Sequence, residues 1–377
     1  MMTQQRNEGR RATQHRQPLL KRRWMSLTAE AAIVALAGSV MLATTNPNPG
    51  NWGLWRIDQP DLARARAAKQ LRYVADGTGV NIYVIDFGVL SSHPDFCCAA
   101  SGRSRVTWVG AFCWGATPRT VDPQTGQPYP EAVAGDGYDG HGTHNASFAA
   151  GRHSGTATNA RVYALRVKGP EGGDCATEQA IVNAVNWIVA NNGPTRAVVN
   201  LSLRATTDAV HTAIHNSINP PSGFGLTYTL TGNTGGPVDR IWGSLIPSEA
   251  LVVGGTDSQD KPIANLATHP YGPLLALFAP AKGLCGASLG EAFNFSTACT
   301  AGAQYSVPEI AVCPQPCPKP ASGDSFAAPF VAGVAAAYLQ QHKTATPAQV
   351  RAAIIDRAAP VSGLPQKILQ MTRAGGH

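Results

Sequence analysis

Short, β-rich apolar runs recur along the sequence and are separated by segments with helical spacing. Residues 80–86 read Val-Asn-Ile-Tyr-Val-Ile-Asp, a composition typical of a strand that is buried on both faces. Residues 177–191 place apolar side chains at helical intervals. This alternation of strand and helix predicts an α/β fold with a largely parallel central sheet and helices on both faces. Further runs of the same β-rich kind lie at residues 160–167, 197–203, 226–231 and 250–254.

No internal repeat or polar linker divides the chain after its N-terminal region. We therefore expect one domain over residues 46–377, with its core at about residues 75–360. Two irregular stretches interrupt the pattern, residues 111–139, which are rich in Gly and Pro, and residues 282–321, which hold four cysteines. Because long stretches without regular structure are usually functional or disordered, we interpret both as loop insertions.

The N-terminus is strongly basic and precedes a short apolar run. Seven of the 30 Lys and Arg residues lie before Trp24, and the apolar run at residues 31–43 is shorter than the roughly 20 residues of a membrane span. Residues 1–45 therefore resemble a cationic leader with a signal peptide, cleaved before Asn46. The alternative is an uncleaved signal anchor at residues 24–45. We predict a secreted or extracytoplasmic protein, which contacts a membrane only if the leader is retained.

The formal charge of +7 comes mostly from this leader. Only two acidic residues precede Asn46, so the rest of the chain has a net charge near +2. Such a balance gives no support to nucleic-acid binding.

All eight cysteines lie in the part of the chain that would be exported. Their even number predicts disulfide bonds in an oxidising compartment, and the sequence leaves their pairing open. A metal site at Cys313-Pro-Gln-Pro-Cys317 is disfavoured because no His lies near it. The cysteines are Cys97, Cys98, Cys113, Cys175, Cys285, Cys299, Cys313 and Cys317.

Asp86 ends the first β-rich run and is followed by Phe87-Gly88. Its carboxylate is expected at the carboxyl end of a strand, the edge where parallel α/β sheets place their sites. An Asp in such a place more often caps a turn, so this residue alone specifies no function.

His141 lies in the segment Asp139-Gly-His-Gly-Thr-His144, which is followed by small residues. The glycines permit a tight turn, and the small residues suit a helix that is packed deep in the core. A His at the start of such a helix is placed to act as a general base toward a hydroxyl. Metal binding by the His-x-x-His pair is disfavoured, because the zinc pattern has its histidines at i and i+4 with a Glu between them.

Ser325 lies where a Gly-rich turn enters an Ala-rich apolar segment at residues 327–339. A serine at the start of a helix benefits from the helix dipole and from backbone N–H groups that could hold an oxyanion. In isolation an N-cap serine is the simpler interpretation.

The three segments together resemble the subtilisin-like serine peptidases. Asp86, then Gly-His141-Gly-Thr-His, then Gly-x-Ser325-x-Ala-x-Pro occur in that family's order. Residues 51–57, Asn-Trp-Gly-Leu-Trp-Arg-Ile, are similar to the start of a mature enzyme of the proteinase K-like group. The resemblance extends over about residues 52–359 and implies a subtilisin-like three-layer fold.

The same resemblance assigns roles to these residues. It implies that Asp86 orients His141, that His141 takes a proton from Ser325, and that Ser325 attacks a peptide carbonyl to form an acyl-enzyme. It also implies that His144 is structural. The expected function is that of a secreted serine endopeptidase acting on proteins.

Residues between these motifs resemble the family's oxyanion hole and peptide-binding segments. Leu230-Thr-Gly-Asn233 resembles the oxyanion segment, which makes Asn233 a donor beside the Ser325 backbone N–H. Leu201-Ser-Leu-Arg204 resembles an edge strand that pairs with an extended peptide substrate. The residues expected to bind substrate are Leu201, Ser202, Leu203, Thr231 and Gly232.

Three residues beside the expected triad depart from the family pattern. Phe87 replaces a Ser or Thr next to the Asp, Asp324 replaces a Thr before the nucleophile, and Phe326 replaces a Met after it. An anion at Asp324 should oppose the oxyanion unless it is protonated, paired or turned away. These departures motivate the alternative of a catalytically impaired pseudo-enzyme that binds peptides.

Two further features of the family look altered. The mature-like start follows the leader directly, so we expect no separate inhibitory prosegment. Ala276 stands where proteinase K-like enzymes have a calcium-binding Asp, so no calcium is expected there, although oxygen-rich loops elsewhere could bind it. We expect a monomer that acts on peptide or protein substrates without a cofactor.

Overall fold

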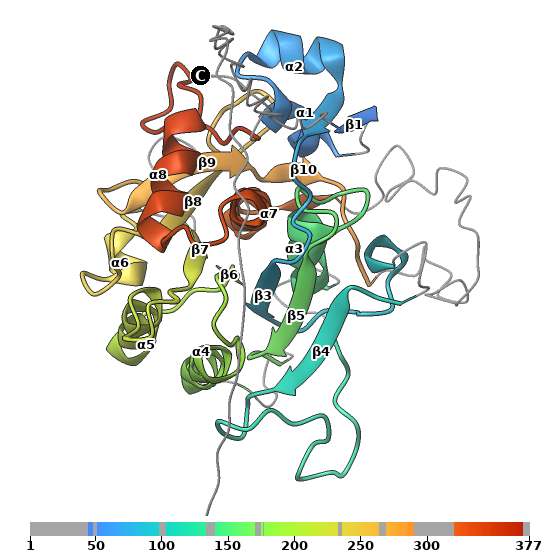
Figure 1. Ribbon diagram of the computed structural model, residues 1–377, viewed down its shortest axis with the longest axis vertical. Coiled ribbons are helices and arrows are strands. Elements are labelled where there is room, and N and C mark those ends of the chain that lie inside the picture. The colour runs from blue at the N-terminus through green and yellow to red at the C-terminus, as the bar shows by residue number, and fades with distance from the viewer. Residues whose placement is uncertain are drawn as a thin grey trace, which may run out of the picture. The chain divides into compact units, whose positions relative to one another are not determined.

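A sheet of seven parallel strands forms the centre of the computed structural model (Figure 1). The strand order is β4-β5-β3-β6-β7-β8-β9. The structure describes residues 44–47, 51–97, 103–132, 140–169, 175, 177–232, 236–263, 269–289 and 320–371. The strands are β3 (Asn81–Asp86), β4 (Val106–Ala111), β5 (Arg161–Arg166), β6 (Ala197–Leu201), β7 (Thr227–Thr231), β8 (Leu251–Thr256) and β9 (Leu275–Pro280).

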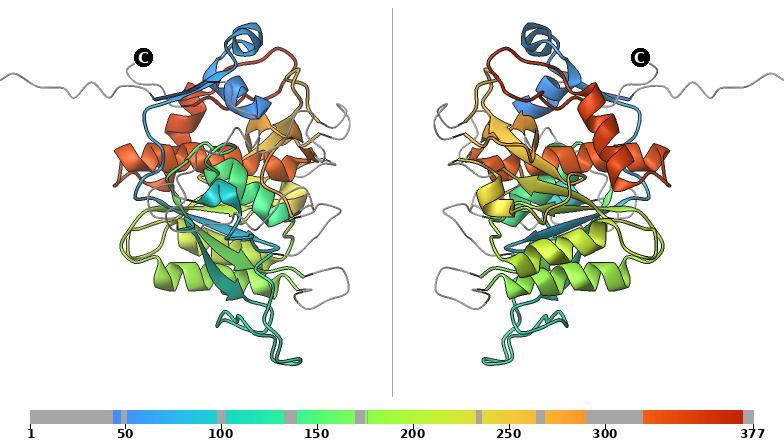
Figure 2. Two further views of the ribbon diagram at one scale, coloured as in Figure 1. Left: turned by 90° about the vertical axis from the view of Figure 1, so that its right-hand side faces the viewer. Right: turned by 90° about the vertical axis from the view of Figure 1, so that its left-hand side faces the viewer.

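Successive side chains of the central strands alternate between two hydrophobic cores. In β3, Ile82 and Val84 face the core that contains α3 and α7, whereas Tyr83 and Ile85 face the core that contains α4 and α5. Helices therefore cover both faces of the sheet, as Figure 2 shows. This arrangement confirms the predicted three-layer α/β fold.

Eight helices accompany the sheet within the described residues. Two small antiparallel pairs lie beside it, β1 (Thr44–Pro47) with β2 (Gln70–Tyr73) and β10 (Lys282–Leu284) with β11 (Ala321–Ser322). Short 3-10 helices are η1 (Pro94–Phe96) and η3 (Asp324–Phe326). The helices are α1 (Trp52–Asp58), α2 (Leu62–Ala68), α3 (His141–Ala150), α4 (Gln179–Asn191), α5 (Asp208–Ile218), α6 (Asp239–Trp242), α7 (Ala328–Gln341) and α8 (Pro347–Arg357).

Helices α3 and α7 pack together at close range because small residues line their contact. A Cβ atom at Gly333 of α7 would collide with Ala149 O of α3 and with Thr156 Oγ1. The Thr156 hydroxyl also donates to Phe330 O at 3.1 Å, which joins the loop after α3 to α7. This packing explains the run of small residues and fixes the two helices that follow His141 and Ser325.

The register of the parallel strands brings several predicted site residues to one edge of the sheet. Asp86 pairs with Arg166 at the ends of β3 and β5, and Leu201 pairs with Ile85 and with Leu230. The carboxyl ends of neighbouring strands therefore lie side by side at the edge of the sheet where the sequence predicts the candidate site.

Residues 41–377 form one compact unit, and residues 1–40 lie outside it and outside the described part. The predicted leader falls almost entirely among residues that the structure does not describe. Over the residues that it does describe, no helix combines the length and the apolar character needed to cross a membrane. The described part of the first predicted insertion forms short bridges between Ala111 and Arg119 and between Val121 and Pro128.

Candidate active site

Asp86 and His141 form a buried hydrogen-bonded pair at the carboxyl edge of the sheet. His141 Nδ1 lies 2.7 Å from Asp86 Oδ1, and both side chains are almost completely buried. Asp86 Oδ1 also accepts from the backbone N–H of Phe87 at 2.7 Å. Because an ionised carboxylate only accepts hydrogen bonds, His141 carries its proton on Nδ1 when neutral, and Nε2 is the basic nitrogen.

Glycines set the position of His141. Gly140 has the left-handed backbone (φ 86°) that precedes helix α3, a conformation that glycine adopts most readily. A Cβ atom at Gly142 would collide with Gly88 O and would lie 3.0 Å from Asp86 Cβ. The start of α3 can therefore approach the end of β3 only because residue 142 has no side chain.

Ser325 lies in η3, directly before α7, and is half-buried. Its carbonyl oxygen accepts from the Ser202 hydroxyl at 2.6 Å. The Ser202 hydroxyl in turn accepts from Asn200 Nδ2 at 3.0 Å, and the Thr229 hydroxyl donates to Asn200 Oδ1 at 3.2 Å. This buried chain of hydrogen bonds ties the backbone of Ser325 to β6 and β7.

Aromatic rings flank the His141 imidazole. The Phe326 ring centroid lies 5.3 Å from that of His141, so the residue after Ser325 contacts the candidate base directly. The Phe87 ring packs edge-on against His141 at 5.7 Å, and Lys168 Nζ lies 5.8 Å from the Phe87 centroid. Two of the departures from the family pattern thus form part of the packing around His141.

The carboxylate of Asp324, the residue before Ser325, is buried. Its Oδ1 accepts from the Gly255 N–H of β8 at 2.7 Å, and its Oδ2 has no hydrogen-bond partner within the described part of the chain. Burial raises the pKa of Asp324 to about 7, against the lowering effect of the Gly255 hydrogen bond. The carboxyl group is therefore largely neutral at slightly acid pH.

The predicted peptide-binding residues lie at the ends of β6 and β7. Leu201 ends β6 and is paired on both sides, by β3 and β7, so the expectation that it belongs to an edge strand is wrong. The chain leaves the sheet after it, at Ser202 and Leu203. Thr231 ends β7, its carbonyl accepts from Trp242 Nε1 at 2.8 Å, and the Gly232 N–H donates to Val253 O. Asn233 lies outside the described residues.

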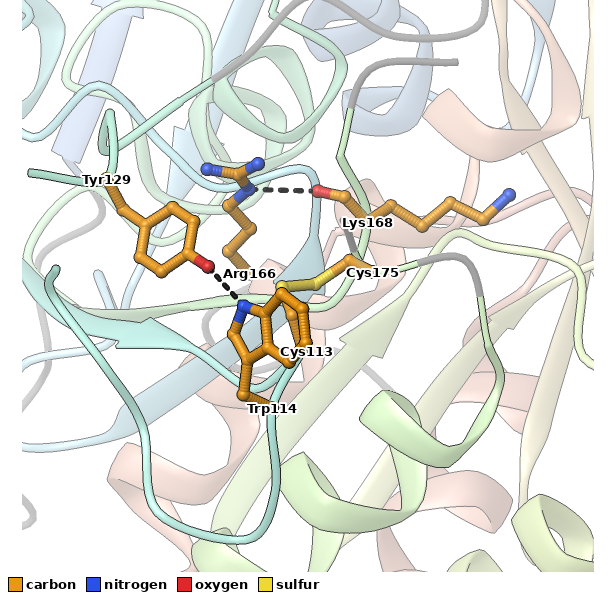
Figure 3. Close-up of a disulfide and its surroundings, with 6 residues drawn as sticks. All are labelled: Cys113, Trp114, Tyr129, Arg166, Lys168 and Cys175. Carbon is orange, nitrogen blue, oxygen red and sulfur yellow. Dashed lines mark hydrogen bonds between the residues drawn. A yellow bond between two sulfur atoms is a disulfide. The ribbon is translucent and has the colours of Figure 1, made fainter. Parts of the chain in front are cut away.

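A disulfide joins two loops at this edge of the sheet. Cys113 follows β4 and is bonded to Cys175, which precedes α4 (Figure 3). Beside it, Trp114 Nε1 donates to the Tyr129 hydroxyl, and the Arg166 guanidinium lies 5.1 Å from the Tyr129 ring centroid. Cys97 and Cys285 also form disulfides.

The position implied for calcium does not fit a metal. Ala276 is a buried residue of β9, and its methyl group offers no oxygen ligand. Within the described ranges, no group of three or more His, Cys, Asp and Glu side chains is arranged to hold a metal ion.

Sequence reasoning missed the polar residues that hold the Asp86–His141 pair and the Ser325 backbone. Asn145 lies one helical turn after His141, and its Nδ2 donates to Asp86 Oδ2 at 2.8 Å. Its signal was an amide at i+4 from the candidate base in a helix of small residues. Asn200 gave no comparable signal, because one Asn in a buried strand does not reveal its partners.

The fold and the site together define an α/β protein with a buried Asp–His pair and a serine before a helix, whose neighbour Phe326 packs against the histidine. Residues 77–375 match the subtilase family. The chain therefore belongs to the subtilase family.

Named relatives agree with this assignment. The chain is 30% identical over 314 residues to an extracellular serine proteinase of Thermus sp. (strain Rt41A), covering 83% of this chain and 62% of that protein. It is 28% identical over 338 residues to a cuticle-degrading serine protease of Arthrobotrys oligospora, covering 88% and 70%. Against the alkaline serine exoprotease A of Vibrio alginolyticus it is 30% identical and spans 49% of that protein's length.

The structure resembles the crystal structure of a cold adapted subtilisin-like serine proteinase. The TM-score is 0.61 at 27% sequence identity, and the match covers 85% of this chain and 98% of the other. The fold is thus shared over nearly the whole of that relative.

Proposed function

We propose that this protein is a serine endopeptidase that hydrolyses peptide bonds in proteins. The observation that carries the proposal is the buried 2.7 Å contact between His141 Nδ1 and Asp86 Oδ1, with the Ser325 segment packed against the same imidazole through Phe326. A buried carboxylate that fixes the tautomer of a histidine prepares its other nitrogen to act as a general base. Relatives named serine proteinases and proteases support the same reaction class.

In the proposed reaction, His141 Nε2 takes the proton of the Ser325 hydroxyl as its oxygen attacks the scissile carbonyl. The resulting imidazolium is stabilised by Asp86 and then gives its proton to the leaving amine. The acyl-enzyme that remains on Ser325 is hydrolysed when His141 activates a water molecule. We assign stabilisation of the oxyanion to the Ser325 backbone N–H and the Asn233 side chain, from the resemblance of Leu230-Thr-Gly-Asn233 to the family's segment.

We further propose that an extended peptide binds along the segments that leave β6 and β7. Ser202 and Leu203 continue beyond the sheet, where backbone groups can pair with a peptide. Thr231 ends the neighbouring strand β7, and Gly232 follows it. The Ser202 side chain already bonds Ser325 O, so its contribution to binding would come from its backbone. Backbone pairing of this type accepts many sequences.

We propose that the protein is exported and acts as a monomer. Four disulfide-bonded cysteines support an oxidising compartment: Cys97, Cys285 and the pair Cys113 and Cys175. The extracellular relative from Thermus supports the same location. The protein would contact a membrane only if residues 24–45 are retained as an anchor.

The contacts of Asp324 do not favour the peptide-binding pseudo-enzyme. Its Oδ1 is held by the Gly255 N–H, and its raised pKa keeps the group neutral in slightly acid solution. A neutral carboxyl opposes an oxyanion much less than a carboxylate does.

Casein cleavage by the purified protein tests the proposal. We expect the wild-type chain to release peptides and the Ser325→Ala variant to lose activity by about 10³-fold or more. Ser222→Ala, at an exposed loop position, serves as the matched serine control and should cleave casein at the wild-type rate. Equal cleavage by the wild-type and Ser325→Ala proteins would contradict the proposed function.

A further inference from the structure

Asn145 bridges the two members of the buried pair. It lies at i+4 from His141 on α3, so both side chains leave the same face of the helix. Its Nδ2 lies 2.8 Å from Asp86 Oδ2 and 3.2 Å from His141 Nδ1. The residue is completely buried.

Chemistry determines the orientation of this amide. The Asp86 carboxylate accepts hydrogen bonds, so the NH₂ group must face it, and the opposite orientation would place two oxygens in contact. His141 Nδ1 donates to the other carboxylate oxygen, at 2.7 Å. The 3.2 Å separation from Asn145 Nδ2 is therefore a close approach of two donors that converge on one carboxylate.

The amide oxygen of Asn145 makes the residue unfavourable for packing alone. Within the part of the chain that the structure describes, no hydrogen-bond donor reaches Asn145 Oδ1, although the atom is buried. An unsatisfied buried oxygen is destabilising, and an apolar residue of the same shape would avoid that penalty. The bond to Asp86 is the compensating interaction that explains an amide at this position.

Phe87 increases the need for such a donor. The side chain that follows Asp86 has no hydrogen-bonding group and instead packs against the His141 ring. Asp86 Oδ1 takes the His141 and Phe87 N–H groups, and Oδ2 takes the amide of Asn145. Each carboxylate oxygen is thereby held by at least one donor.

We propose that Asn145 is a positioning residue of the catalytic site, which holds the Asp86 carboxylate in place and limits the proton affinity of His141. The inference rests on the proposed function and deepens it. The bond to Oδ2 fixes the plane of the carboxylate and hence the direction of the His141 ring. The positive end of the amide also opposes a positive charge on the imidazole.

Removing the amide should therefore shift the protonation of His141 to higher pH. Among the described residues, the charged or titratable groups near the ring include the Asp86 carboxylate, Lys168 above Phe87, and His144, whose ring shares a contact with Phe326. None of these groups changes in an Asn145 variant. A shift of the His141 titration can then be assigned to the lost amide.

The test uses Asn145→Leu in the full chain, because leucine keeps the shape and removes the donor. We expect kcat per titrated active site to fall about ten- to a hundredfold while KM stays within about twofold. The acid limb of the kcat/KM profile should move up by roughly half a pH unit. In protein labelled with ¹⁵N-histidine, the NMR titration midpoint of His141 should move in the same direction.

Val334→Ala, at a buried apolar position of α7, is the control for a general loss of packing. It should lower the melting temperature without changing kcat per active site, the acid limb of the kcat/KM profile or the NMR titration midpoint of His141. The inference would be overturned by an Asn145→Leu protein that shows a cooperative thermal unfolding transition and keeps the wild-type kcat and the wild-type NMR titration midpoint of His141. A wild-type chain without activity would contradict the proposed function alone, since the NMR midpoint tests the role of Asn145 without catalysis.

Discussion

Replacing Asp324 with Asn should change how the stability of the protein depends on pH. Asp324 is 3% exposed, and burial raises its pKa from 3.8 to about 7. The asparagine keeps an oxygen for the Gly255 N–H and has the shape of the protonated acid, but it cannot ionise. The variant therefore stays fixed in the neutral form that the buried site favours.

The sign and size of the effect follow from the pKa difference. Because the folded protein binds the Asp324 proton more tightly than the unfolded chain, this contribution to stability is present below about pH 4 and is lost as pH rises through about 7. One pKa unit corresponds to about 1.4 kcal/mol, so the loss amounts to roughly 4 kcal/mol between pH 4 and 8. The free energy of unfolding of Asp324→Asn should not show this loss, because asparagine does not ionise.

Urea unfolding from pH 4 to 9 measures the effect, in a Ser325→Ala background that prevents self-digestion. The free energy of unfolding of Asp324→Asn minus that of the parent should rise by roughly 4 kcal/mol between pH 4 and about 8 and stay constant above it. The control Asp356→Asn, at an exposed position of α8, should give a nearly flat difference. A difference for Asp324→Asn that stays flat within about 0.5 kcal/mol would refute the raised pKa.

Two further predictions concern the start of α3 and the disulfide between Cys113 and Cys175. Gly142→Ala places a methyl group against Gly88 O and should lower kcat by about 100-fold or more by displacing the start of α3, as steady-state kinetics would show. The control is Gly193→Ala, at a glycine with positive φ where an added Cβ atom would meet no neighbouring atom. It should lower the free energy of unfolding by about 1 kcal/mol and leave kcat unchanged. Equal losses of kcat in the Gly142→Ala and Gly193→Ala proteins would contradict the steric argument. Replacing Cys113 and Cys175 with Ser opens a loop of 62 residues and should lower the free energy of unfolding by up to about 4 kcal/mol in urea titrations, whereas an unchanged midpoint would refute this.

Much of the fold could be predicted from local sequence patterns. The β-rich runs at residues 80–86 and 226–231 became the buried strands β3 and β7, because side chains on both faces of a parallel sheet must be apolar. The helix at residues 177–191 followed from its apolar spacing and became α4. Strands β4 and β9 were not predicted from the sequence. Three of the six residues of Val106–Ala111 are exposed or only partly buried, and Leu275–Pro280 ends in a proline.

The candidate site was predictable where chemistry is carried by a short motif. His141 and Ser325 follow glycine-rich turns that leave a clear sequence pattern, and the order of the motifs supplied their partner Asp86. Asn145 bonds Asp86, 59 residues away, and Asn200 reaches Ser325 through the Ser202 hydroxyl, so their roles required the fold. The burial of Asp324 was likewise hidden, because the donor to its carboxylate oxygen is the Gly255 N–H, 69 residues away.

The central claim is that Ser325 is a nucleophile activated by His141 and Asp86. Reaction with a fluorophosphonate probe, followed by mass spectrometry of the labelled peptide, tests it most directly. We predict stoichiometric labelling on Ser325 in the wild-type protein, and labelling slower by about 10³-fold or more in His141→Ala. A label on another residue, or equal labelling rates in the wild-type and His141→Ala proteins, would contradict the account.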